Sequence, residues 1–202
     1  MIRIHHKVRK ATVLGPGVRY VVWVQGCMQR CPGCVSPQAQ PMDGGTEMPV
    51  DALVEDILST DGIEGITISG GEPFLQAAAL VRLIDALRAR RDLGVIVYTG
   101  CLLEDLQSDQ PAGAAELLSR IDLLIDGPYV DELNDDGALR GSSNQRVIPL
   151  TKRYTGAVAD YGVPGGRKTE LMFTADGFFL TGVPSVATRR LIRMSRGEVD
   201  EA

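Results

Sequence analysis

Four short apolar runs constrain the fold of this chain more than any other feature, and they span residues 18–24, 65–69, 94–98 and 121–125. Stretches with apolar residues at helical spacing separate the runs. Runs of this kind are typical of strands buried on both faces of a parallel sheet, and strand–helix alternation predicts βαβ units. A complete eightfold barrel needs about 250 residues. Because the chain has 202, we expect an α/β fold that is an incomplete TIM-type barrel with parallel strands and outer helices.

A change in character from Lys152 onward predicts two parts. Residues 1–151 hold a lead-in, the four runs and a last core strand near 146–150. Residues 152–168 are glycine-rich and predict a loop; their glycines are Gly156, Gly162, Gly165 and Gly166. We therefore expect a core of residues 1–151 and an extension of residues 152–202 that packs on the core.

The extension has two recognisable elements. The apolar segments 170–173 and 178–180 are joined through Asp176-Gly177, which predicts a β-hairpin. A short basic helix is expected to follow, and it carries Arg189, Arg190, Arg193 and Arg196. The sequence thus predicts a hairpin and a helix appended to the core.

Composition and charge exclude several classes of function. No apolar run approaches the roughly 18–20 residues of a membrane span, and the basic N-terminus is not followed by the apolar segment of a secretory signal. The net charge is −5, whereas phosphate binding needs clustered cations. We therefore expect a cytoplasmic protein with neither a membrane nor a nucleic acid as its partner.

Three cysteines, Cys27, Cys31 and Cys34, lie within eight residues directly after the first apolar run. Disulfides are rare in the cytosol, so metal or redox chemistry is the better interpretation. Soft sulfur ligands select zinc, copper(I) or iron–sulfur clusters. A [4Fe–4S] cluster usually takes four cysteines, so three would leave one iron open to a ligand from outside the protein.

Unusual segments follow each of the other apolar runs as well. They are Gly70-Gly71-Glu72-Pro73, Thr99-Gly100 and Asp126-Gly127. In open parallel sheets, ligands gather outside the carboxyl ends of the strands. We therefore expect these segments and the cysteine loop to share one rim.

The order of these elements resembles the radical S-adenosylmethionine (SAM) superfamily, in particular the activating proteins of anaerobic ribonucleotide reductases and related glycyl-radical activases. The resemblance runs from about residue 15 to residue 145. It is carried by Gly15-Pro16-Gly17-Val18-Arg19, the cysteine loop, Ser69-Gly70-Gly71-Glu72-Pro73, Tyr98-Thr99-Gly100, Ile125-Asp126-Gly127-Pro128-Tyr129 and Arg140-Gly141-Ser142-Ser143-Asn144-Gln145.

The resemblance implies that Cys27, Cys31 and Cys34 hold a [4Fe–4S] cluster whose fourth iron chelates SAM. One electron, from a donor such as flavodoxin or ferredoxin, then cleaves SAM to a 5′-deoxyadenosyl radical, which abstracts hydrogen from a glycine of a partner enzyme. Because the cofactors carry this chemistry, no side chain is assigned as a catalytic acid or base. The implied SAM-binding residues are Gly70, Gly71, Glu72, Pro73, Thr99, Asp126, Ser142 and Asn144.

Other interpretations of the cysteine loop stay open from the residues alone. A zinc site prefers four ligands, and His5, His6 or Cys101 could supply the fourth. The Cys31-Pro-Gly-Cys34 segment also fits thiol–disulfide exchange. The alternative functions are a radical SAM enzyme that modifies another peptide or a small molecule, and a non-enzymatic zinc or iron–sulfur interaction module. Free cysteine is often buried, and we expect Cys101 to be a small apolar residue rather than a cluster ligand.

Overall fold

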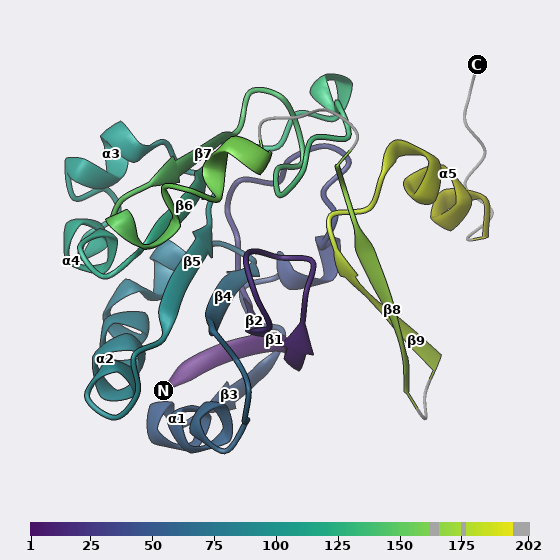
Figure 1. Cartoon of the computed structure of the whole chain (residues 1–202). Helices are drawn as coiled ribbons and strands as arrows, with labels where there is room; N and C mark the ends of the chain where they lie inside the picture. Colours follow the sequence, from purple (N-terminus) through teal and green to yellow (C-terminus); the bar gives the residue numbers. More distant parts are fainter. Residues whose placement is uncertain (162–165, 175–176, 196–202) are drawn as a thin grey trace.

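The computed structural model describes residues 1–161, 166–174 and 177–195, and its centre is a seven-stranded sheet (Figure 1). The strands lie in the order β3-β1-β2-β4-β5-β6-β7. Their bounds are β1 (Ile2–Ala11), β2 (Arg19–Val24), β3 (Thr46–Met48), β4 (Gly65–Gly70), β5 (Gly94–Tyr98), β6 (Leu123–Asp126) and β7 (Arg146–Pro149). Strands β2, β4, β5 and β6 are parallel, which confirms an α/β fold with a parallel-rich central sheet.

The expectation of parallel strands alone was wrong at the sheet's edges. Strand β1 pairs antiparallel with both β2 and β3, and β7 pairs antiparallel with β6. The chain between β6 and β7 contains only one short 3₁₀ helix, η3 (Asp131–Leu133). A parallel strand needs a crossover connection, usually a helix, so β7 returns beside β6 in the opposite direction.

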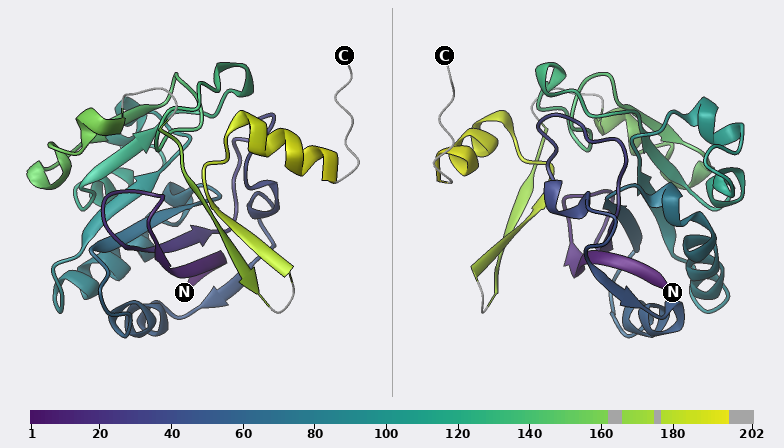
Figure 2. Two further views of the ribbon diagram at one scale, coloured as in Figure 1. Left: turned by 45° about the vertical axis from the view of Figure 1, so that its right-hand side comes forward. Right: turned by 180° about the vertical axis from the view of Figure 1, so that it is seen from behind.

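The α-helices from α1 to α4 cover one face of the sheet, and Figure 2 shows their arrangement. Their bounds are α1 (Val50–Leu58), α2 (Ala77–Arg88), α3 (Leu103–Gln107) and α4 (Ala114–Leu118). Their apolar sides form the main core with one side of the strands, and this core includes Leu53, Ile57, Leu80, Leu83, Leu117, Ile66, Val95 and Leu124. Helices on a single face are the outcome expected when parallel strands are added in one direction with right-handed crossovers.

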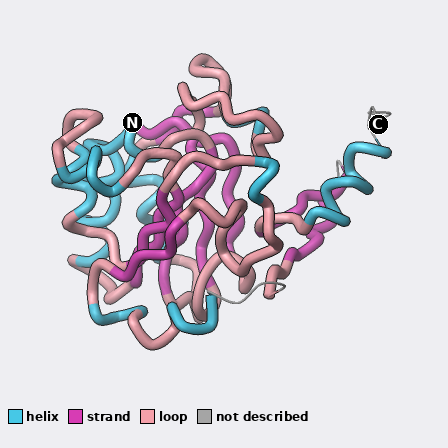
Figure 3. The backbone as a smooth tube through the Cα atoms, turned by 90° about the horizontal axis from the view of Figure 1, so that it is seen from above, coloured by secondary structure: helices cyan, strands magenta, loops and turns pink. Residues whose placement is uncertain are grey.

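The described residues of the C-terminal hairpin and helix lie on the opposite side of the sheet (Figure 3). The extension contains the hairpin of β8 (Thr169–Thr174) and β9 (Gly177–Gly182), followed by α5 (Val186–Ser195). Phe179 of β9 stacks on His6 at 3.9 Å and meets the edge of Trp23 at 5.3 Å. The predicted hairpin and helix are therefore confirmed, whereas Gly162, Gly165, Asp176 and Arg196 lie outside the described residues.

A buried arginine ties the extension to the other end of the strands. The Arg19 side chain, fully buried at the start of β2, donates to Thr67 Oγ1 at 2.7 Å and to the Gly94 carbonyl at 2.9 Å. It also donates to the Tyr154 hydroxyl at 2.8 Å and forms an ion pair with Glu64. The residues after 151 therefore share hydrogen bonds with the core. Within the part of the chain described, none of the helices combines the length and apolarity that a membrane crossing requires.

Candidate functional site

The cysteine loop and the loop after β4 are joined through their backbones at the carboxyl ends of the strands. The Gly71 N–H donates to the Val24 carbonyl and the Glu72 N–H donates to the Gly26 carbonyl, both at 2.7 Å. The Cys27 N–H donates to the Gln40 carbonyl at 2.9 Å. These bonds fix the start of the cysteine loop against the Gly-Gly-Glu segment, so the two predicted parts of the rim do lie together.

The glycine pair has a packing reason that the sequence did not reveal. Gly70 has a φ of +105°, and a Cβ on it would lie 2.5 Å from the Val24 N and O atoms. A Cβ on Gly71 would lie 2.2 Å from the Gly26 carbonyl oxygen. Only glycine permits this approach. The pair therefore makes room for the backbone that leads into the cysteine loop, and its contact with SAM stays a prediction.

Glu72 links the loops after β4 and β5. Its side chain is buried, with 3 % exposure. It accepts hydrogen bonds from the Phe74 N–H at 3.1 Å, the Thr99 hydroxyl at 2.8 Å and the Gly100 N–H at 2.9 Å. Burial raises the pKa of Glu72, while these donors oppose the shift. The structure thus brings Glu72 and Thr99 together, next to Pro73, which begins the 3₁₀ helix η2 (Pro73–Gln76).

The three loop cysteines are free thiols, and all are partly exposed. The Cys34 N–H donates to the Cys31 carbonyl at 3.2 Å, and Cys27 Sγ accepts from the Gln29 N–H at 3.4 Å. Burial raises the pKa of Cys27 and Cys31, and the charges of Cys34 and Glu72 raise both further. Both shifts disfavour the thiolate forms of Cys27 and Cys31 in the metal-free protein.

The donor set fits an iron–sulfur cluster, because three thiols on one loop are soft ligands of the kind that such a cluster takes. Among the described residues, no three histidine, cysteine, aspartate or glutamate side chains converge to hold one ion. Each cysteine of a [4Fe–4S] cluster binds a separate iron, so its ligands need not converge on one atom. His6, one of the possible zinc ligands, stacks on Phe179 of the hairpin instead. The three thiols on this loop are soft, partly exposed donors, and they match a [4Fe–4S] cluster.

Cys101 lies at the same rim. Gln29 of the cysteine loop donates through Nε2 to Cys101 Sγ at 3.8 Å, and the Cys101 N–H donates to Thr99 Oγ1 at 3.0 Å. The side chain is only partly buried and packs against the main core. The prediction of an apolar packing residue describes one side of Cys101, because the other side meets the cysteine loop.

Asp126 has an internal partner for each carboxylate oxygen. The side chain is fully buried at the end of β6. Arg146 of β7 donates through Nε to Oδ1 at 2.9 Å and also forms an ion pair with Oδ2. The Leu103 N–H donates to Oδ2 at 2.8 Å. Asp126 therefore anchors α3 and β7 in this structure, and its contact with SAM stays a prediction.

Ser142 and Asn144 lie in the loop that folds over the end of β6. Ser142 Oγ accepts from the Val130 N–H at 3.2 Å, and Asn144 Nδ2 donates to the Pro128 carbonyl at 2.7 Å. Gln145 Nε2 donates to the Gly127 carbonyl at 2.8 Å. The Gly-Ser-Ser-Asn-Gln segment thus fixes the chain after β6, and cofactor contacts by Ser142 and Asn144 stay predictions.

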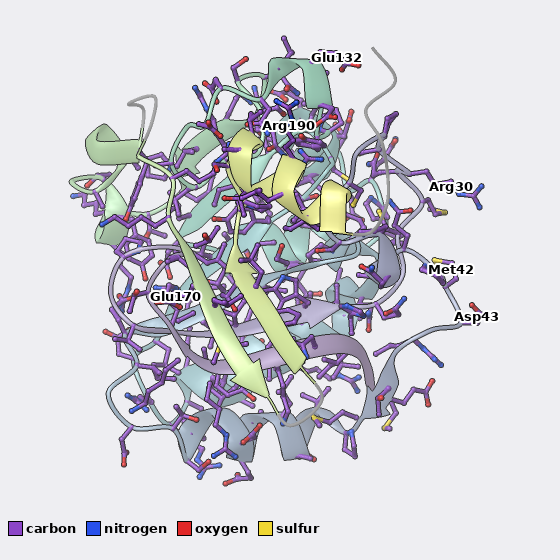
Figure 4. The ribbon with its side chains drawn as sticks, turned by 90° about the vertical axis from the view of Figure 1, so that its right-hand side faces the viewer. Arg30, Met42, Asp43, Glu132, Glu170 and Arg190 are labelled. Carbon is purple, nitrogen blue, oxygen red and sulfur yellow. The ribbon has the colours of Figure 1, made fainter. Side chains whose placement is uncertain are left out.

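The sequence did not predict one contact of this site, because the contact comes from the extension, far away along the chain. Arg189 of α5 donates to the carbonyl oxygen of Gly33, between Cys31 and Cys34. A basic helix was the only sign of it in the sequence. Figure 4 looks onto α5, with Arg30, Met42 and Asp43 projecting at the edge beyond it.

The fold and the cysteine rim define a class of iron–sulfur protein, and comparison with known proteins agrees. A family model described as "4Fe-4S single cluster domain" matches residues 13–148. The chain belongs to this family.

Named relatives are more specific. The anaerobic ribonucleoside-triphosphate reductase-activating protein of Escherichia coli K12 is 32% identical over 146 residues, 68% of this chain and 92% of the relative. The protein of that name from Salmonella typhi is 33% identical over 74% of this chain and 99% of its own length. The pyruvate formate-lyase-activating enzyme of Staphylococcus epidermidis is 32% identical over 75% of this chain and 62% of its own length. These relatives confirm the resemblance to radical SAM activases.

Proposed function

We propose that this chain is a radical SAM enzyme that activates a glycyl-radical enzyme of the anaerobic ribonucleotide reductase type by abstracting hydrogen from one of its glycines. The match to reductase-activating proteins over 92% of one relative and 99% of another carries the proposal. The cofactors are a [4Fe–4S] cluster and SAM, in agreement with the family model. When bound, they supply a 5′-deoxyadenosyl radical by one-electron cleavage of SAM.

The chain's own residues position the cofactors. Cys27, Cys31 and Cys34 hold the cluster, and the backbone contact between Gly71 and Gly26 supports the loop that carries them. Glu72 binds the loop after β5, and its ionised form keeps about one oxygen lone pair for the SAM amino group, because a carboxylate accepts about four hydrogen bonds and three donors are in place. The proposed SAM contacts at Gly70, Pro73, Thr99, Asp126, Ser142 and Asn144 belong to the same rim.

The architecture and surroundings form part of the proposal. Helices on one face of the sheet support a partial barrel whose inner face carries the extension. Residues 1–151 are the proposed core, and the contacts of Tyr154 and Phe179 support an extension, 152–202, packed on it. We further propose that the electron donor is a protein such as flavodoxin or ferredoxin. The proposed location is the cytoplasm, with neither a membrane nor a nucleic acid as a partner. The free thiols and the net charge of −5 support this setting.

Anaerobic reconstitution with iron and sulfide tests this function. The reduced protein is expected to release 5′-deoxyadenosine from SAM, measured by chromatography. Replacing Cys27, Cys31 or Cys34 by Ser should abolish release and lower bound iron, whereas Cys101→Ser should retain both. A glycyl-radical signal in electron paramagnetic resonance of an added reductase would identify the partner class. Retained SAM cleavage in any loop-cysteine variant would refute the ligand assignment.

A further inference from the structure

Arg189 joins the extension to two loops of the rim. Its side chain is only 12 % exposed and lies 2.9 Å from Asp131 Oδ1 in an ion pair. The guanidinium stacks over the Tyr129 ring at 4.9 Å and donates to the Tyr129 hydroxyl. It also donates to the Gly33 carbonyl. One guanidinium therefore connects the cysteine loop, the loop after β6 and α5.

Gly33 is packed tightly against this pair. Its φ is +67°, and a Cβ there would lie 2.9 Å from Asp131 Cγ and 3.1 Å from Arg189 Nη2. The backbone immediately before Cys34 therefore rests directly on Arg189 and Asp131. A movement of either side chain would move the residue that precedes a candidate cluster ligand.

Hydrogen bonds to the core hold helix α5, which carries Arg189, in place beside the cysteine loop. The Val186 N–H at the start of α5 donates to Asp136 Oδ1 at 2.9 Å. Arg167, itself nearly buried, donates to the Pro184 carbonyl at 3.0 Å and to the Arg140 carbonyl at 2.6 Å. These bonds fasten the first turn of α5 to the loop after β6.

We propose that Arg189 is a positioning residue of the cluster site, which orders the cysteine loop and places a positive charge beside the cluster. The proposal rests on the proposed function for its cluster. Reduction potentials of iron–sulfur clusters depend on nearby charge and hydrogen bonds, and a cation stabilises the added electron. Residue 189 lies outside residues 13–148, which match the family model, so the family match does not assign this role.

The first test uses the metal-free full-length chain, so it does not depend on the cluster. Hydrogen exchange at residues 28–34 is expected to be faster in Arg189→Gln than in wild type. The control is Arg82→Gln, which removes an equal charge from an exposed position on α2 and should match wild type. Equal exchange in all three proteins would overturn the ordering role.

The second test measures the reduction potential of the reconstituted cluster by a redox titration followed with electron paramagnetic resonance. Arg189→Gln should lower the potential, Arg189→Lys should restore it in part, and Asp131→Asn should raise it, because Asp131 offsets the charge of Arg189. A merely structural role does not give shifts of opposite sign. Unchanged potentials, or a downward shift in both Arg189→Gln and Asp131→Asn, would overturn the proposal while leaving the proposed function intact. Wild-type protein that binds no cluster would instead overturn the proposed function, and the exchange result would stand alone.

Discussion

At Glu72 a carboxylate is buried among neutral donors. The groups that bind it are the N–H groups of Phe74 and Gly100 and the hydroxyl of Thr99. Desolvation disfavours the charged form, and burial raises the pKa of Glu72 above its ordinary value of 4.5 despite these hydrogen bonds. Between pH 4.5 and this raised pKa, Glu72 is therefore protonated to a greater extent in the folded protein than in the unfolded chain.

This shift predicts a loss of stability as pH rises. Between pH 4.5 and the raised pKa, the folded state holds more protons, so the free energy of unfolding should fall by up to about 1.4 kcal/mol per pH unit. The contribution is fully present below pH 4.5. Urea denaturation of the metal-free protein from pH 4 to pH 8 measures the slope. Glu72→Gln, which cannot titrate, should lack this component, and parallel curves for the two proteins would contradict the assignment.

Single residues differed in how far the sequence could place them. Cys27, Gly71 and Glu72 could be assigned to one rim because each follows a recognisable parallel strand. The ion pair of Asp126 could not be predicted, since it depends on β7 pairing antiparallel with β6, opposite Arg146. The contact of Arg189 with Gly33 spans 156 positions, and no local pattern encodes it.

Among the elements, the cysteine loop and the loop after β4 approach each other closely through their backbones. Gly71 has no room for a Cβ because the Gly26 carbonyl is 2.2 Å from that position. Gly71→Ala should therefore separate the two loops, cost about 1–3 kcal/mol in the free energy of unfolding, and reduce the iron bound on reconstitution. Thermal denaturation and iron analysis measure the two effects.

Gly156, in the C-terminal extension, provides a matched control. A Cβ on Gly156 would meet nothing within 4 Å, so Gly156→Ala should change neither stability nor bound iron. If Gly71→Ala behaves like Gly156→Ala, the loops do not depend on this close approach.

Helices and strands with a clear periodic pattern of apolar residues could be predicted from the sequence. Strands whose place depends on neighbouring strands could not. Helical spacing located α1 and α2, and the apolar runs located β2, β4, β5 and β6. The basic first strand was interpreted as a lead-in, although Ile2, Ile4 and Val8 alternate with polar residues and are buried. Its place depends on β2 and β3, which flank it. The direction of a strand at the edge of the sheet likewise depends on the segment that connects it to its neighbour. The types of residue in the strand do not reveal this direction.

At the scale of the whole molecule, the extension contacts both the central sheet and the cysteine loop. Its hairpin packs on the sheet through Met172 and Phe179, against Val21 and Trp23. Its helix reaches the cysteine loop through Arg189. Anything that loosens the hairpin is therefore expected to disturb the cluster site as well, and the His6–Phe179 stack is the natural point at which to test this.

The position of His6 predicts that this packing is sensitive to acid. Burial lowers the pKa of His6 below its ordinary value of 6.5, and the charge of His5 lowers it further. Below pH 6.5 the unfolded chain binds more protons than the folded one, so the stabilisation present above pH 6.5 is lost as pH falls through the folded pKa. The free energy of unfolding should drop by up to about 1.4 kcal/mol per pH unit in that window. His6→Phe keeps an aromatic ring against Phe179 without the titrating group, so it should lack this drop.

At pH 5.5, hydrogen exchange in β8 and β9 should be slower in His6→Phe than in wild type, with the two proteins alike at pH 7.5. Equal exchange at pH 5.5 would show that protonation of His6 does not control how the extension docks.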